Sequence, residues 1–232
     1  MRMIVEFCKG PAVRFISHLD LMRAVQRALR RSGLPVKYSG GFNPHQILAF
    51  AAALSVGATS TGEIMDVGLT QEVSSEEFLR RLGKEMPPDL NLRSAHQAPD
   101  NYPSMMSIAA EADYQISLRL WARCSLDELR GGLQRMMDNP ILATKKTKAG
   151  PKEIDLRELI CRIGVDESEV QGEMTVATLS LRCVCAQTGA LNPELLLPRL
   201  LEGWGLAGEY DVCRTGFYAI TGEGERVPLW AL

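Results

Sequence analysis

The side chains best suited to acid–base chemistry are two histidines near the N-terminus, His18 and His45. Ser17, His18 and Asp20 have the residue types of a hydrolase triad, but a triad needs three side chains that converge in space. A serine three residues before an acid has instead the spacing of a helix N-cap and its first-turn partner. His18 would then lie at a positive helix end, where it can contact a phosphate or share acid–base work with His45. Purely structural hydrogen bonding by both histidines is the alternative.

A glycine-rich loop leads into the second histidine, with the sequence SGGFNPH over residues 39–45. Paired glycines let backbone N–H groups approach an anion, and the rings of Tyr38 and Phe42 have the shape to stack on a base. The loop lacks the GK[ST] ending of a Walker loop. Ordinary turn chemistry, with both rings in the core, is the alternative. The candidate contacts in this loop are Gly40, Gly41, Phe42, Asn43 and His45.

The segment between the two histidines has the pattern of an amphipathic helix over residues 17–32, with Gly33 as its stop. At 100° per residue, four arginines fall within a sector of about 100° opposite the apolar stripe. These like charges repel one another, so the face is either neutralised by acids of the same chain or offered to an anionic partner. The face consists of Arg23, Arg27, Arg30 and Arg31, flanked by Arg14 before the helix and Lys37 after it.

The formal charge of −2 is the sum of segments with very different net charges along the 232 residues. Residues 1–60 hold eight Lys and Arg against two Asp and Glu, residues 61–112 hold four against nine, and residues 113–232 hold fourteen against seventeen. The near-neutral total argues against a histone-like protein coated in positive charge. The acidic middle segment can fold back onto the arginines, and such internal ion pairing is the alternative to an anionic partner.

A second basic cluster lies in the C-terminal half, in the stretch ATKKTKAGPK, where we expect a β-hairpin. Lysines on a hairpin commonly protect a sheet edge, which is the alternative to a binding role. Together with the arginine helix, the hairpin can flank a groove that follows a phosphate backbone. The candidate residues are Lys145, Lys146, Lys148 and Lys152.

The expected elements follow a similar order in the two halves of the chain. Residues 1–97 contain strand, helix, strands, helix and strand, and the order repeats in residues 109–232, with hairpin strands at 141–147 and 152–156 and a long strand at 173–185. Residues 98–108 are rich in Pro, Asn and Ser, which is typical of a linker. The sequence therefore predicts an α+β protein of two ferredoxin-like (βαββαβ) units packed side by side.

The composition excludes several other classes of protein. With 46% hydrophobic and 23% charged residues, the chain is neither disordered nor fibrous. The six cysteines lack the spacing of a zinc site or of a radical iron–sulfur cluster, so we expect buried thiols, no metal site and no cofactor. Cys183 and Cys185, which would share a strand face, are the alternative redox or metal pair. Because no apolar run is long enough to span a membrane and no signal peptide is recognisable, we expect a cytoplasmic protein without membrane contact.

Residues 14–69 resemble the signature region of the radical-SAM-linked protein family, a bacterial domain of unknown function. The resemblance rests on SHLD at the helix start, GFNPH in the loop, and VG followed by GE at residues 62–63. It extends in outline through EIDLR at 153–157, PE at 193–194 and Arg214. Gln46 and Ile47 depart from the proline and basic residue that family members often have. The domain occurs alone or C-terminal to a radical SAM protein, which implies a radical SAM enzyme as partner and no established reaction.

Three hypotheses about function follow. The leading one is a non-catalytic RNA-binding or substrate-presenting module that assists a separate radical SAM enzyme, because the chain has no cluster-binding cysteines of its own. A metal-independent endoribonuclease with His18 and His45 as acid and base is one alternative. The other is a protein-interaction module whose basic face docks on an acidic surface of the radical SAM enzyme, without RNA.

Overall fold

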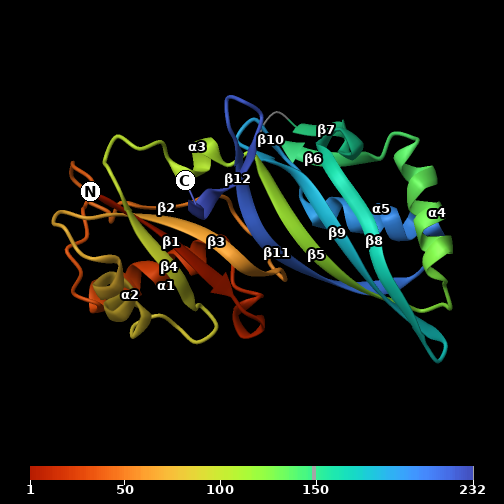
Figure 1. Ribbon diagram of the computed structural model, residues 1–232, viewed down its shortest axis with the longest axis horizontal. Coiled ribbons are helices and arrows are strands. Elements are labelled where there is room, and N and C mark those ends of the chain that lie inside the picture. The colour runs from red at the N-terminus through yellow and green to blue at the C-terminus, as the bar shows by residue number, and fades with distance from the viewer. Residues whose placement is uncertain (148–149, 232) are drawn as a thin grey trace. The chain divides into compact units, whose positions relative to one another are not determined.

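The computed structural model describes residues 1–147 and 150–231, with the backbone alone at residues 145–147. It confirms an α+β protein with a large, mostly antiparallel sheet (Figure 1). The described helices are α1 (His18–Arg31), α2 (Ser75–Gly83), α3 (Met105–Ile108), α4 (Leu126–Met137) and α5 (Pro193–Trp204). The described strands are β1 (Arg2–Lys9), β2 (Leu48–Phe50), β3 (Thr59–Gly68), β4 (Leu92–Ala98), β5 (Glu111–Leu120), β6 (Leu142–Thr147), β7 (Gly150–Asp155), β8 (Ile160–Gln171), β9 (Met174–Ala186), β10 (Gly189–Ala190), β11 (Gly208–Ile220) and β12 (Arg226–Pro228).

The chain divides into two compact units whose boundaries differ from the expected ones. Unit 1 contains Met1–Glu111 and Arg214–Leu232, and unit 2 contains Ala112–Cys213. The expected linker, residues 98–108, instead belongs to unit 1 and includes the short helix α3. The C-terminal segment returns to unit 1 because β11 is a long strand that pairs with β5 and with β3. Local sequence patterns cannot predict that the C-terminal segment belongs to unit 1, because this depends on pairing between strands that are far apart in the sequence.

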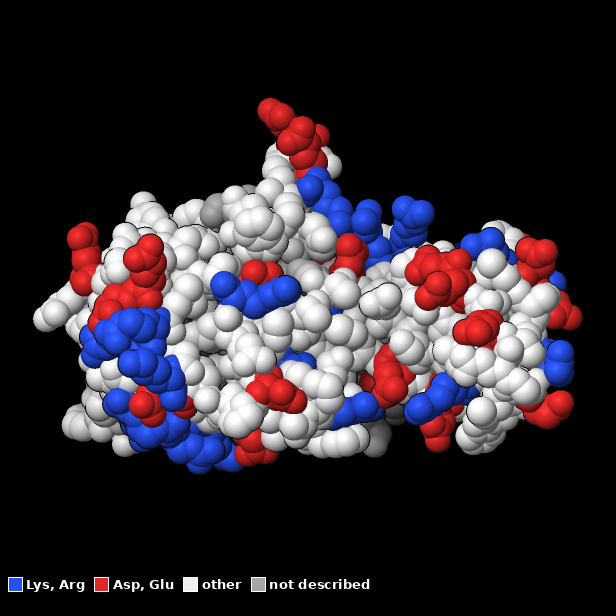
Figure 2. Space-filling model, turned by 60° about the horizontal axis from the view of Figure 1, so that its bottom comes forward, with Lys and Arg blue, Asp and Glu red and all other residues white. Residues whose placement is uncertain are grey.

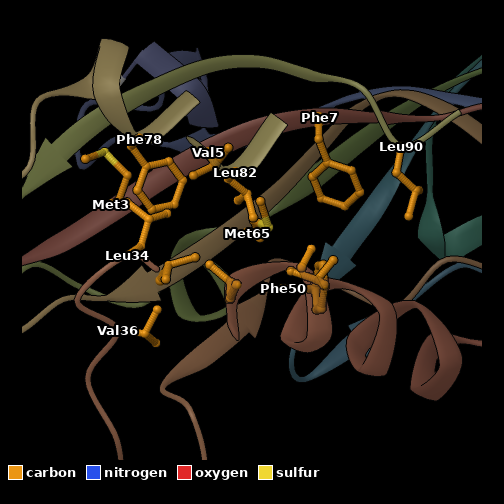
Figure 3. Close-up of a cluster of buried hydrophobic side chains, with 14 of the residues drawn as sticks. Met3, Val5, Phe7, Leu34, Val36, Phe50, Met65, Phe78, Leu82 and Leu90 are labelled. Carbon is orange, nitrogen blue, oxygen red and sulfur yellow. The ribbon is translucent and has the colours of Figure 1, made fainter. Parts of the chain in front are cut away.

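Unit 1 has the strand order β11-β3-β1-β4, with β2 also on β3 and β12 also on β11. Residues directly opposite in antiparallel strands share a face, so the register of β1 with β3 places Val5 beside Met65 and Phe7 beside Glu63. The apolar side of α1 and Phe78 of α2 pack on this face and form one buried cluster (Figure 3). Ile4 on the opposite face is also fully buried, so β1 is covered on both sides.

Helices α1 and α2 of unit 1 begin where the sequence predicts. The Ser17 hydroxyl accepts a hydrogen bond from the Asp20 N–H, and Ser74 accepts one from Glu77 at the start of α2. These contacts satisfy backbone donors that a helix N-terminus otherwise leaves unpaired. Residues 36–38 form isolated bridges with Leu69 and Gln46 instead of the expected short strand.

Unit 2 has the strand order β10-β9-β5-β11, with β8 also on β9. The hairpin of β6 and β7 was expected among the strands of the unit, but it forms a separate two-stranded sheet. The strand that pairs with β9 in place of the hairpin is β8. The sequence did not predict β8, because most of its side chains are exposed and polar. Of the six cysteines, Cys124, Cys183 and Cys185 are buried as expected, whereas Cys8 and Cys213 are half-buried and Cys161 is exposed, so the expectation of buried thiols is wrong for these three.

Candidate functional site

The arginine face of α1, defined as Arg23, Arg27, Arg30 and Arg31, is exposed along its whole length. Burial of Leu21, Val25, Ala28 and Leu29 on the opposite side of the helix fixes its orientation. Figure 2 shows Lys and Arg side chains gathered over the α1 and α2 end of unit 1, with a few Asp and Glu side chains between them. The helical periodicity therefore predicted the position of these charges correctly.

Two of the four arginines have acidic partners. Arg23 Nη1 lies 3.2 Å from Asp20 Oδ1, and Arg31 Nε lies 2.8 Å from Glu85 Oε2. Within the described part of the chain, Arg27 and Arg30 have no ion pair. Glu85 is thus the acid that the segment 61–112 contributes to this face. Because exposed ion pairs contribute only about 0–1 kcal/mol, an incoming anion can replace both at little cost.

Two features of the N-terminal end of α1 bear on the predicted phosphate contact and acid–base role of His18. The Asp20 carboxylate accepts a hydrogen bond from Ser17 Oγ at 2.7 Å, so an anion already lies in the first turn. The His18 ring packs edge-on against Phe50, with the ring centroids 5.4 Å apart. Burial is the main cause of a lowered His18 pKa, with Arg214 lowering and Glu63 raising it. A lowered pKa leaves the imidazole neutral at neutral pH.

A buried charge cluster, defined as Lys9, Glu63 and Arg214, lies behind His18. Arg214 donates to the Glu63 carboxylate twice, from Nε at 2.8 Å and from Nη2 at 2.6 Å. Its guanidinium also lies 4.2 Å from the Phe217 ring centroid. Burial lowers the pKa of Lys9, while the negative charge of Glu63 raises it. The cluster carries two cations and one anion, so main-chain carbonyls must satisfy the remaining donors.

Those carbonyls belong to the two segments that flank the start of α1. Lys9 Nζ donates to the carbonyls of Arg14 at 2.8 Å and Ala58 at 3.2 Å. Arg214 Nη1 donates to the Ala53 carbonyl at 3.1 Å. The cluster thus holds residues 53–58 beside Arg14. Sequence reasoning did not find the cluster, although Lys9 continues the inward-facing alternation of Val5 and Phe7.

The loop of residues 39–45 lies towards the opposite end of α1. Ser39 Oγ and His45 Nδ1 are 2.8 Å apart, and the ring of Phe42 is fully exposed and not in the core. Gly41 has a φ of +99°, which explains a glycine there. Gly40, Asn43 and Pro44 are exposed as well. The sequence therefore identified an accessible loop.

The structure separates the two histidines. The chain is extended between His45 and Phe50, and five residues at about 3.3 Å each span roughly 16 Å. Because the His18 ring contacts Phe50, His45 lies far from it. No described hydrogen bond or ring contact joins the two imidazoles. Lys37 precedes the loop, and its Nζ atom lies 3.6 Å from Asp100 Oδ2.

Of the hairpin lysines, the structure describes the side chain of Lys152 and only the backbone of Lys145 and Lys146. In the register of β6 with β7, Lys145 is opposite Lys152 and Lys146 is opposite Pro151. Lys152 is exposed, and Lys148 lies outside the described residues. The expected hairpin is therefore present, and a binding role for its lysines stays a prediction.

Two further features bear on function: groups of side chains that could bind a metal ion, and helices that could cross a membrane. Among the residues that the structure describes, no three His, Cys, Asp or Glu side chains gather as metal ligands. Within the same residues, no helix has both the length and the apolar character needed to cross a membrane.

Comparisons with known proteins give one family and two remote likenesses. A family model described as an uncharacterized protein conserved in bacteria (DUF2344) matches residues 2–193. Among solved structures, one chain of a Cbf5-Nop10-Gar1 complex is similar, with 9% identity and a TM-score of 0.47 over 93% of this chain and 48% of that chain. An unknown protein from Galdieria sulphuraria has 11% identity and a TM-score of 0.25 over 92% of this chain and 97% of that chain. This chain thus spans about half the length of the first, and no curated protein matches it.

Proposed function

The chain belongs to this family of uncharacterized proteins conserved in bacteria, and we propose that it is a non-catalytic accessory protein that binds RNA through the arginine face of α1. The observation that carries the proposal is the exposure of Arg27 and Arg30 without an acidic partner in the described part of the chain. Arginine is well suited to phosphate because its planar guanidinium donates two parallel hydrogen bonds.

The spacing of the arginines supports a polymeric anion. Arg23, Arg27 and Arg30 lie within about 60° of one another around α1 and rise by roughly 10 Å along its axis. A single small anion can contact one or two of these side chains, whereas a phosphate backbone can follow all three. Release of counterions from the backbone supplies the binding free energy.

The topology supports two related units. Taking β2 as the second strand, unit 1 has the order β4-β1-β3-β2, and taking β8 as the second strand, unit 2 has the order β11-β5-β9-β8. Both correspond to the order 4-1-3-2 along their own βαββαβ sequence. We therefore infer that each unit is ferredoxin-like, with the β6–β7 hairpin inserted after α4.

A separate, cytoplasmic radical SAM enzyme is the proposed partner, on the strength of the resemblance of residues 14–69. The endoribonuclease hypothesis has less support, because His18 is half-buried, packs on Phe50 and lies far from His45. Docking of the arginine face on an acidic protein remains the competing outcome of the test.

The test compares two variants with the same change in charge. Arg23→Glu, Arg27→Glu and Arg30→Glu together reverse the arginine face. Arg80→Glu, Arg119→Glu and Arg199→Glu reverse three exposed arginines elsewhere, each of which already has an acidic neighbour. Fluorescence anisotropy with labelled RNA should show binding about 100-fold weaker, or more, for the first variant and a small change for the second. Equal weakening in both variants would contradict the proposal, and so would undiminished binding in the first.

A further inference from the structure

A patch of exposed apolar side chains lies at the N-terminal end of the arginine face. Phe15 is 72% exposed, Leu19 59% and Val56 53%. Phe15 and Val56 come from segments that meet, because the Gly57 N–H donates to the Arg14 carbonyl at 2.9 Å. The Phe15 ring reaches Gly57, because a Cβ atom there would lie 4.0 Å from Phe15 Cε1, and neighbouring exposed apolar groups are typical of a binding surface. We call Phe15, Leu19 and Val56 the apolar patch.

The patch continues directly into the arginine face. At 100° per residue, Leu19 projects within about 40° of both Arg23 and Arg30 around α1. Phe15 lies in the turn that precedes the helix, three residues before His18. A ligand that follows the arginines along the helix therefore reaches an aromatic ring at the end of the row.

The buried charge cluster holds the patch in place. Lys9 donates to the carbonyl of Arg14, next to Phe15, and to that of Ala58, two residues after Val56. The Arg14 guanidinium lies 5.0 Å from the Phe15 ring centroid, on one side of the ring. The Arg14 guanidinium thus supports one face of the Phe15 ring, while the residue remains exposed. Little conformational entropy is therefore lost when a ligand stacks on the ring.

We propose that Phe15 stacks on an unpaired base of single-stranded RNA whose phosphates lie along the arginine face, with Leu19 and Val56 contacting the base edge. The inference rests on the proposed function and narrows its ligand from RNA in general to a single strand. A duplex hides the faces of its bases within the helical stack, whereas a single strand offers them to aromatic side chains. A protein partner would bring apolar side chains to the same patch, and it is the competing outcome.

The first experiment measures the affinity for labelled oligoadenylate, alone and annealed to oligouridylate. We expect the wild-type protein to favour the single strand. Phe15→Ala should weaken single-strand binding by about 5- to 100-fold, without changing the salt dependence, because the Phe15 ring neutralises no phosphate. Trp121→Ala is the matched control, since Trp121 is an aromatic residue that is 59% exposed and belongs to unit 2.

The second experiment tests stacking itself. Phe15→Trp keeps an aromatic ring, so it should retain the single-strand affinity and show a larger RNA-dependent quench of fluorescence than the wild-type protein. Equal affinity of the wild-type protein for single strand and duplex would overturn the inference, as would wild-type binding by Phe15→Ala. Either result leaves the proposed function intact, provided that reversal of the arginine face still abolishes RNA binding. If the wild-type protein binds no RNA, the proposed function and the inference both fail.

Discussion

The guanidinium of Arg214 and the carboxylate of Glu63 form a two-point ion pair between residues 151 positions apart, and each side chain is 1% exposed. The pair lies in unit 1 and joins β11 to β3. Together with Lys9, it holds the segments at the start of α1 through their main-chain carbonyls. The accessible surface that we assign to RNA therefore depends on three buried ionic side chains.

Removal of the anion from this pair should destabilise the protein strongly. Glu63→Gln leaves the buried Arg214 without a counter-charge, and we expect the free energy of unfolding in urea to fall by about 3–5 kcal/mol. Glu77→Gln, which breaks the exposed pair with Arg80, should cost less than about 1 kcal/mol. Similar losses in the two variants would show that the buried pair has no special role.

Two neighbouring glycines of α4 should respond in opposite directions to alanine. A Cβ atom at Gly132 would overlap the Trp204 ring, which is held by a hydrogen bond to the Leu129 carbonyl, whereas at Gly131 it would meet only the tip of Arg135 at 3.6 Å. We expect Gly132→Ala to lower the free energy of unfolding by about 1–3 kcal/mol. Gly131→Ala should raise it by about 0.5–1 kcal/mol, because alanine favours the helix. Thermal unfolding of both variants checks the packing of α4 on α5.

Gln46 should be replaceable with a gain in stability. The residue is 3% exposed, and neither carboxamide atom has a hydrogen-bond partner among the described residues. Gln46→Leu keeps the size and removes the unpaired groups, so the free energy of unfolding should rise by about 1 kcal/mol. Gln97→Leu is the control, because Gln97 donates to the Val73 carbonyl and should gain nothing. A loss of stability in Gln46→Leu would count against this description of the loop.

His18 should make stability depend on pH just below its ordinary pKa of 6.5. Burial lowers its pKa in the folded state, so the unfolded state binds more protons between the folded pKa and 6.5. Stability should therefore rise with pH through this window and fall as pH drops below 6.5. His18→Gln should flatten that part of the urea-unfolding profile. His96, whose pKa burial also lowers, adds a contribution of the same sign in every variant.

Local patterns predicted most of the elements. Caps such as Ser17, Ser74 and Ser125, and the apolar spacing behind them, determine where α1, α2 and α4 begin. The same periodicity predicted that the arginines of α1 face away from the core. These features depend only on residues within a few turns of one another, so the sequence contains them directly.

Features that depend on distant pairing were not predictable. β8 looks like a solvated loop because its support comes from β9 across the sheet. Lys9, Glu63 and Arg214 look like surface charges until the register of β1, β3 and β11 brings them together in the core. The extended segment from His45 to Phe50 separates His45 from His18, which packs on Phe50, whereas the sequence alone placed the two histidines near each other.

The measurement that tests the RNA assignment most directly is the salt dependence of RNA binding. The logarithm of the binding constant should fall linearly with the logarithm of the salt concentration. On a single strand, each phosphate that the protein neutralises adds about 0.7 to the steepness of this line, so replacement of Arg23, Arg27 and Arg30 by alanine should make it shallower by about 2. A slope equal to that of the wild-type protein would contradict the assignment of RNA to the arginine face.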